Sequence, residues 1–238
     1  MASDDRIGGP ARPAAPYEPQ RWLSMSIVLL LLGIALVLAF LIESLRADQY
    51  TLSFVTVNLP VSDTEVVQNH QRLARDCSIL AVLSVAVAAL WLIWQYRAHA
   101  NVRALVPGTR FRPLYGLVSW VIPGLNLVLP LLAMRELWRA SNPDVEDWRR
   151  ARTTALLWLW WLLVLAGLAL AVFALAPVSH GGVTAADLSV RDRRGVPAAG
   201  IGLLAALAAA LLFGLLQGRM VLKEDRVRLG AWKGWSER

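Results

Sequence analysis

Long apolar runs separated by short charged stretches dominate the pattern of this chain. Five stretches without a charged residue are long enough to cross a membrane, since a helix needs about 20 apolar residues to span the hydrocarbon core. These stretches are 22–42, 77–96, 113–134, 153–186 and 195–218. Runs of this length predict an all-α integral membrane protein, because helices satisfy their own backbone hydrogen bonds inside lipid.

The third run differs from the others because prolines and glycines interrupt it. An interior proline removes a backbone hydrogen bond and clashes with the preceding turn, at about 3 kcal/mol or more. We therefore expect two half-helices rather than one continuous span over 113–134. Broken backbone at membrane depth must be satisfied by protein or water, so this run predicts a re-entrant hairpin. The prolines and glycines of this run are Pro113, Gly116, Pro123, Gly124 and Pro130.

The distribution of basic residues favours four spans over five. If 113–134 enters and leaves on the cytoplasmic side, the cytoplasmic segments hold 18 Lys and Arg and the outer segments hold 6. If it crosses completely as a fifth span, the split becomes 10 against 14. Because cytoplasmic loops carry an excess of Lys and Arg, we expect spans at about 22–42, 77–96, 153–176 and 200–218. Both termini are then cytoplasmic.

Both ends of the chain are polar tails. Residues 1–21 form a tail in which prolines recur every third residue from 10 to 19, the period of a polyproline II helix. Its composition predicts disorder, with recognition by a proline-binding domain as the alternative. Residues 219–238 form a basic tail. There we expect contact with anionic lipid rather than with nucleic acid.

Local patterns predict where helices begin. Ser62–Glu65 has the form of a capping box, so a helix is expected over 63–105, about 65 Å long and longer than the bilayer core. Ser141–Asp144 predicts a second helix start at its proline, with that helix continuing into the third span. The alternating run 49–57 predicts a short strand or an interfacial segment.

The fourth span contains a stripe of small residues spaced four apart. Such a stripe lets another helix approach closely. Two interpretations remain open, a homo-oligomer interface and packing within one bundle. The stripe consists of Gly202, Ala206, Ala210, Gly214 and Gly218.

Composition supports the membrane assignment and offers no chemistry. Hydrophobic residues make up 57% and charged residues 17% of the 238 residues, whereas soluble domains usually have about 25% charged residues. The single Cys77 excludes an intrachain disulfide and a cysteine-only metal site. The three histidines have no metal-ligand spacing, and no catalytic motif is present. We therefore expect no enzymatic activity and no cofactor.

One segment, 94–141, combines several polar and proline-containing motifs. These are a Trp-x-x-Arg-x-x-x-Asn helix end, a Phe-x-Pro, a Trp-x-x-Pro-x-x-Asn-Leu, a further Pro and an Arg-Glu-x-Trp-x-x-Ser. They lie on Trp94, Arg97, Asn101, Phe111, Pro113, Trp120, Pro123, Asn126, Leu127, Pro130, Arg135, Glu136, Trp138 and Ser141. This pattern resembles a family of small multi-pass membrane proteins of actinobacteria, which is catalogued only as a domain of unknown function. The resemblance implies a bacterial cell-membrane protein with four spans, and it supplies no activity or catalytic residue.

Within this segment, seven residues are candidates for a pocket or a partner-binding face: Trp94, Arg97, Asn101, Trp120, Asn126, Arg135 and Glu136. Asn126 lies between two prolines in an apolar run, where an amide needs a partner. Either it bonds to backbone groups that the prolines free, or it lines a small polar pocket between half-helices, as in some transporters.

These observations rank three functions. The first is a non-catalytic module that binds a partner protein or lipid at the cytoplasmic face, because the motifs cluster there and lack chemistry. The second is a small transporter or channel-like subunit that uses the broken hairpin around Asn126. The third is a membrane enzyme. No ionisable residue is firmly placed at mid-bilayer, which argues against an ion pump.

Overall fold

The computed structural model describes residues 17–58, 60–106, 108–145, 147–177 and 184–228. Within these residues the fold is all-α, without strands. The helices are α1 (Arg21–Thr56), α2 (Asp63–Leu105), α3 (Pro113–Val121), α4 (Leu129–Ala140), α5 (Ala155–Leu175) and α6 (Ala185–Arg228), with two short 3₁₀ helices, η1 (Leu125–Leu127) and η2 (Trp148–Arg150). The predictions of a disordered N-terminal tail and a lipid-binding C-terminal tail concern mainly residues 1–16 and 229–238, which lie outside the described residues.

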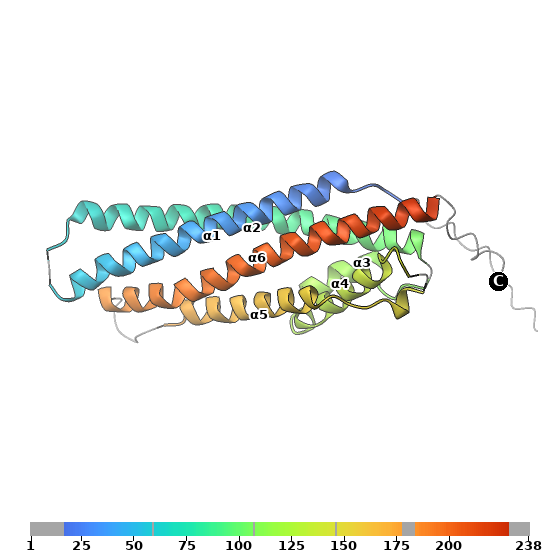
Figure 1. Ribbon diagram of the computed structural model, residues 1–238. Coiled ribbons are helices and arrows are strands. Elements are labelled where there is room, and N and C mark those ends of the chain that lie inside the picture. The colour runs from blue at the N-terminus through green and yellow to red at the C-terminus, as the bar shows by residue number, and fades with distance from the viewer. Residues whose placement is uncertain (1–16, 59, 107, 146, 178–183, 229–238) are drawn as a thin grey trace, which may run out of the picture.

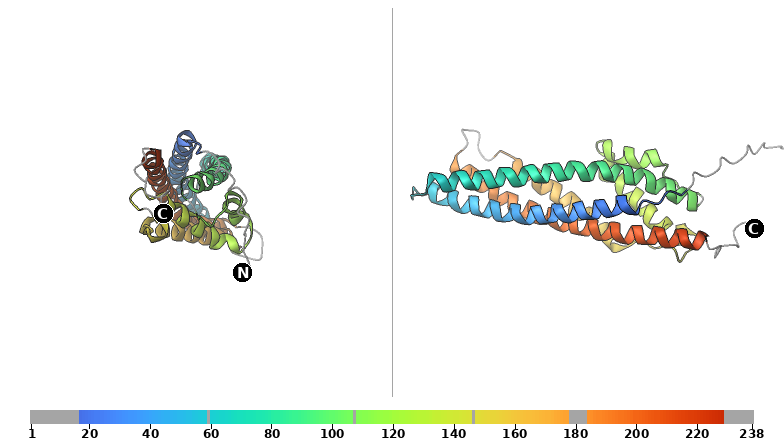
Figure 2. Two further views of the ribbon diagram at one scale, coloured as in Figure 1. Left: turned by 90° about the vertical axis from the view of Figure 1, so that its right-hand side faces the viewer. Right: turned by 90° about the horizontal axis from the view of Figure 1, so that it is seen from above.

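The four long helices run lengthwise as an up-and-down bundle (Figure 1). α1 packs mainly against α6 and α2, and α5 packs against α6. α1 begins at the end of the bundle where α6 ends, and we call this the terminal end. α3 and α4 form a hairpin at that end, and its turn points along the bundle towards the middle (Figures 1 and 2).

Among the described residues, four helices are long and apolar enough to cross a membrane, and each corresponds to one predicted span. α5 has 21 residues and matches the predicted 153–176 closely. α1, α2 and α6 have 36, 43 and 44 residues, or about 54, 65 and 66 Å. These three helices therefore extend well beyond a hydrocarbon core of about 30 Å.

The strand predicted at 49–57 is wrong, because α1 continues through it to Thr56. Ser44, Asp48 and Thr51 are spaced i, i+4 and i+7, so they share one helix face. All three side chains are buried. The face is kept helical by its partners on α2, since the Ser44 hydroxyl donates to Asp76 at 2.6 Å and Asn69 donates to Thr51 at 2.8 Å.

α2 begins at Asp63 and ends at Leu105, as predicted, but the capping box does not form. Ser62 is the N-cap residue, and its hydroxyl makes no capping hydrogen bond. The amides of Glu65 and Val66 donate instead to the Ser62 carbonyl, at 2.9 and 3.2 Å. Because this helix start is exposed, water can satisfy its remaining amides.

The helix predicted to start at Pro143 is also wrong. The Asn142 side chain accepts the Asp144 amide at 3.0 Å, which closes a local turn rather than a helical one. α5 starts only at Ala155, where the Thr154 hydroxyl accepts the Leu156 amide at 3.3 Å.

Basic residues of α6 hold the loop that replaces that helix. α6 extends ten residues past the predicted span end at 218. The Lys223 ammonium donates to the carbonyls of Asn142 and Val145 at 2.9 and 3.1 Å, and Arg226 donates to the Pro143 carbonyl at 2.6 Å. These contacts between α6 and the backbone at Asn142–Val145 hold this segment in its non-helical conformation.

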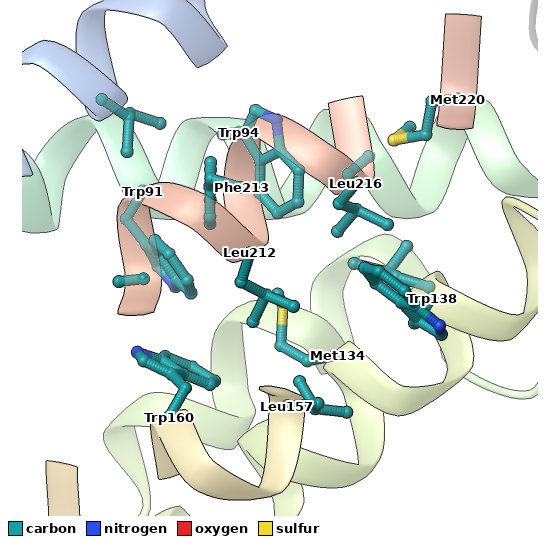
Figure 3. Close-up of a cluster of buried hydrophobic side chains, with 14 of the residues drawn as sticks. Trp91, Trp94, Met134, Trp138, Leu157, Trp160, Leu212, Phe213, Leu216 and Met220 are labelled. Atoms are coloured by element: carbon teal, nitrogen blue, oxygen red, sulfur yellow. The ribbon is translucent and has the colours of Figure 1, made fainter. Parts of the chain in front are cut away.

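An aromatic cluster forms the centre of the core and joins α2, α3, α5 and α6. Figure 3 shows its members Trp91, Trp160 and Phe213. The Trp91 ring of α2 lies 4.4 Å from Phe213 of α6, 5.5 Å from Trp120 of α3 and 5.8 Å from Trp160 of α5, between ring centroids. Trp120 also contacts Trp161 of α5 at 5.9 Å. The cluster therefore anchors the short α3 to the long helices.

The small-residue stripe of α6 divides between two environments. Ala206 and Ala210 are buried, and a Cβ on Gly202 would lie 3.4 Å from Leu38 of α1. Gly214 and Gly218 are exposed, with nothing within 4 Å of an added Cβ. A four-residue step turns a helix about 40° past a full turn, so the stripe winds away from the bundle. Its first part packs within the bundle, whereas its last two residues face outwards.

Candidate functional site: a basic crevice between α3 and α4

A crevice of about 750 Å³ lies between α3, α4 and the loops beside them. Aliphatic side chains line the part near the hairpin turn. The other part combines four arginines with Glu136 and with the aromatic side chains of Phe111, Tyr115 and Trp148. The lining residues are Arg110, Phe111, Tyr115, Val118, Ser119, Ile122, Leu125, Leu129, Leu132, Arg135, Glu136, Arg139, Trp148 and Arg149. The two kinds of lining make this crevice suited to an amphiphilic ligand.

The hairpin that forms the crevice follows from its prolines and one glycine. α3 ends before Ile122, which is extended with ψ 116°, as expected for the residue before a proline. Gly124 has φ +82°, a left-handed conformation that glycine adopts without a steric penalty. Pro130 lies in the first turn of α4, where its missing N–H costs nothing. The prediction of two half-helices is confirmed.

A glycine lets α3 lie directly on α2. A Cβ on Gly116 would come 2.6 Å from the His99 ring and 3.4 Å from the Gln95 side chain, and both of these side chains are buried. On the same helix the Ser119 hydroxyl donates to the Gly116 carbonyl at 2.7 Å. The wall of the crevice formed by α3 is therefore fixed by close packing.

Glu136 holds the rim of the crevice in place. Its carboxylate accepts the backbone amides of Arg110 and Phe111, at 3.1 and 2.9 Å, and its side chain is buried. Both oxygens are used within the protein, so Glu136 shapes the crevice rather than presenting a free negative charge to a ligand.

The remaining charges around the crevice are four arginines. Arg139 donates to the Ala151 carbonyl at 2.8 Å, and Arg149 donates to the Gly108 carbonyl at 3.2 Å. Arg149 also lies over the Trp148 ring, 5.1 Å from its centroid. Arg135 is half-buried, and its Nε is enclosed without a hydrogen-bond partner. Backbone carbonyls and rings position these groups without neutralising them, so the crevice attracts anions.

Of the predicted site residues, Arg135 and Glu136 line the crevice. Trp94 and Trp120 belong to the aromatic core instead. The Trp94 indole N–H donates to the Ser24 hydroxyl at 2.9 Å, and that hydroxyl donates to Gln217 at 2.7 Å. Trp94 therefore links α1, α2 and α6 inside the bundle.

Arg97 and Asn101 bind the N-terminal segment rather than the crevice. Asn101 accepts the Glu18 amide at 3.0 Å and donates to the Glu18 carbonyl at 2.8 Å. The Arg97 guanidinium lies 3.9 Å from the Glu18 carboxylate. This paired contact fixes the chain just before α1 begins.

Asn126 lies in the hairpin turn, and its side chain does not line the crevice. Its backbone amide donates to Ile122 at 2.9 Å. The carbonyl of the neighbouring Leu127 accepts the indole N–H of Trp161 at 3.0 Å. A tryptophan of α5, rather than Asn126, therefore satisfies a backbone group freed at the proline breaks.

The sequence analysis missed Arg110, Arg139, Trp148 and Arg149. The position of Arg139 could have been predicted, because it shares one face of α4 with Leu129 and Leu132 at helical spacing. Arg110 lies in a loop, and Trp148 and Arg149 lie in the short 3₁₀ helix η2, so no periodicity could place these three beside α4.

Comparison with known proteins gives one match. The model of a family described as a domain of unknown function (DUF4328) matches residues 58–218. This range includes both walls of the crevice and the aromatic core. No curated protein and no solved structure matches the chain.

Proposed function

This chain belongs to the DUF4328 family, whose domain has no known function, and on that premise we propose that it is a non-catalytic membrane protein that binds an anionic lipid in the α3–α4 crevice. The observation that supports this proposal most directly is the division of the crevice lining into an apolar and a basic part. A phospholipid with an acidic headgroup has the same division.

The two parts are separated by a distance that suits a lipid. Leu129 and Arg139 lie ten residues apart on α4, which corresponds to about 15 Å along the helix axis. An acyl chain would lie along Ile122, Leu125 and Leu129, while the headgroup phosphate would meet Arg135 and Arg139.

Aromatic contacts support placing the hairpin turn at membrane depth. Trp120 of α3 contacts Trp91 and Trp161, which lie within the predicted spans 77–96 and 153–176. The basic part of the crevice then lies at the cytoplasmic surface, together with both termini, as the distribution of Lys and Arg predicts. In this arrangement a lipid of the inner leaflet enters the crevice sideways without leaving the bilayer.

Native mass spectrometry of the full-length protein, delipidated in detergent, tests this proposal. We expect phosphatidylglycerol to bind more tightly than phosphatidylcholine with the same acyl chains. Each basic residue near an anionic lipid contributes about 1 kcal/mol, so Arg135→Gln should weaken phosphatidylglycerol binding about fivefold. The matched control is Arg103→Gln, because Arg103 is exposed on α2 and does not line the crevice.

A second arm of the experiment tests the apolar part. Ile122→Ser should weaken binding of long-chain phosphatidylglycerol and leave binding of glycerol phosphate unchanged. Equal binding of the two phospholipids would refute the lipid proposal. Binding of glycerol phosphate as tight as that of the whole lipid would assign the crevice to a soluble anion instead.

A further inference from the structure

A pair of buried carboxyl groups lies towards the end of the bundle opposite the crevice. Asp48 of α1 and Asp192 of α6 are 2% and 6% exposed. Each lies three residues from the close contact between Leu45 and Gly195, and because α1 and α6 run antiparallel, this contact places the two carboxyl groups against each other. A hydrogen bond between two carboxyl groups requires one proton. Each residue also has one buried oxygen, Oδ1 of Asp48 and Oδ2 of Asp192, that finds no hydrogen-bond partner among the described residues.

Within the part of the chain that the structure describes, no neighbouring cation is well placed to neutralise both carboxylates. From α2, the His70 Nδ1 lies 3.8 Å from Asp48 Oδ1, and the His70 side chain is 60% exposed. Asp76 of α2 is engaged by the Ser44 hydroxyl and by Arg75, at 2.6 and 3.1 Å. From α6, exposed Arg191 acts on Asp192 from the adjacent position in the chain.

The pair lies outside the apolar spans, where a proton can exchange with water. Asp48 follows the predicted span 22–42, and Asp192 precedes the span 200–218 by eight residues, about 12 Å of helix. The pKa of Asp192 is raised to about 7, first by burial and then by a hydrogen bond with Asp48 and by the negative charge of Asp48, while Arg191 acts to lower it.

We propose that Asp48 and Asp192 bind one proton between them and thereby hold the ends of α1 and α6 together in a pH-dependent contact. When Asp192 is protonated, its O–H donates to the Asp48 carboxylate. When the proton leaves to water, two negative charges face each other in a poorly solvated site and repel. The helices are closely packed beside the pair, since a Cβ on Gly195 would lie 3.2 Å from Leu45, so the repulsion is relieved by separating them.

The direction of the pH effect follows from the proton count. The closed pair binds one more proton than a separated, hydrated pair, whose carboxyl groups titrate near 4. The ratio of open to closed protein therefore rises with pH, by up to tenfold per pH unit between about pH 4 and 7, and then levels off. We therefore expect the contact to open as the pH rises, because Asp192 has a raised pKa when the contact is closed.

Pulsed electron paramagnetic resonance on the full chain in lipid nanodiscs tests this proposal. Spin labels are attached at Arg46→Cys and Arg193→Cys, two exposed positions on α1 and α6, in a Cys77→Ser background. We expect one short distance at pH 5 and a growing longer population towards pH 8. In Asp192→Asn, whose amide N–H can donate to Asp48 at every pH, the short distance should persist throughout.

Three further variants make the result decisive. Asp48→Asn repeats the test from α1 and should also remove the pH response. His70→Gln should keep it, whereas its loss there would assign the response to the histidine and overturn the proposal. Glu43→Gln, on the exposed side of α1, should behave as the unchanged protein. A pH response that survives in Asp192→Asn, or an unchanged protein with one distance at all pH values, would also overturn it.

Discussion

Replacing Glu136 by glutamine should destabilise the protein, although the change alters one side-chain atom. In the structure, one carboxylate oxygen accepts the Arg110 amide and the other accepts the Phe111 amide. In Glu136→Gln only the amide oxygen can accept, and the new NH₂ group faces a backbone N–H. One buried hydrogen bond is lost, and a donor is left opposite another donor.

The magnitude follows from the type of bond that is lost. A hydrogen bond to a charged group contributes about 1.5–3 kcal/mol, and Glu136 is 6% exposed, so water from the crevice replaces the missing partner poorly. For a domain of this size, 1 kcal/mol corresponds to about 2–4 °C in the melting temperature. We therefore expect the melting temperature to fall by roughly 3–12 °C.

The assay is thermal unfolding of the purified protein in detergent, followed by tryptophan fluorescence. Glu43→Gln is the matched control, because the Glu43 side chain is 72% exposed and its ion pair is with Arg46 on its own helix. Its melting temperature should stay within about 1 °C of the unchanged protein, as expected for an exposed pair. An unchanged melting temperature in Glu136→Gln would refute the assignment of Glu136 as the residue that holds the crevice rim.

Two further predictions use the same assay. Gly116→Ala should lower the melting temperature because its Cβ would come 2.6 Å from the buried His99 ring. The control Gly218→Ala, where no described atom lies within 4 Å of the added Cβ, should raise it slightly because alanine has a higher helix propensity. A rise in both variants would show that α3 does not pack tightly on α2. Ala210→Leu should lower the free energy of unfolding by about 1–3 kcal/mol because it overpacks a buried position. Gly214→Leu, at the exposed end of the stripe, should not destabilise the monomer. Equal losses of stability in the two variants would place both positions in one interface.

Much of the architecture was predictable because it depends on lengths and breaks in the sequence. The four long helices follow from apolar runs, and the bounds of α2 follow from its start signal and length. The break between α3 and α4 follows from Pro123 and Gly124, which impose their backbone conformations locally. These features need no knowledge of the rest of the fold.

The errors arose where distant residues override local patterns. The run 49–57 alternates like a strand, yet it is helical because Thr51 is bound by Asn69 of α2. The start signal at Ser141–Asp144 is overridden by Lys223, which is 81 residues from Asn142 in the chain. The crevice arginines Arg110 and Arg149 depend on loop conformations in the same way. Sequence patterns report local preferences, whereas these sites are set by contacts across the bundle.

The length of α5 has a consequence for the membrane in which the protein resides. Its 21 residues measure about 32 Å, close to the hydrocarbon thickness of about 30 Å, whereas α1, α2 and α6 extend far past it. In a thicker bilayer those three helices can accommodate the change by shifting which residues are immersed. α5 cannot, because it ends at Leu175 and starts beside the loop that α6 holds. Hydrophobic mismatch costs a fraction of a kcal/mol per Å. It would therefore strain α5 and the hairpin turn that Trp161 contacts through the Leu127 carbonyl. The composition of the surrounding bilayer is thus coupled to the shape of the crevice.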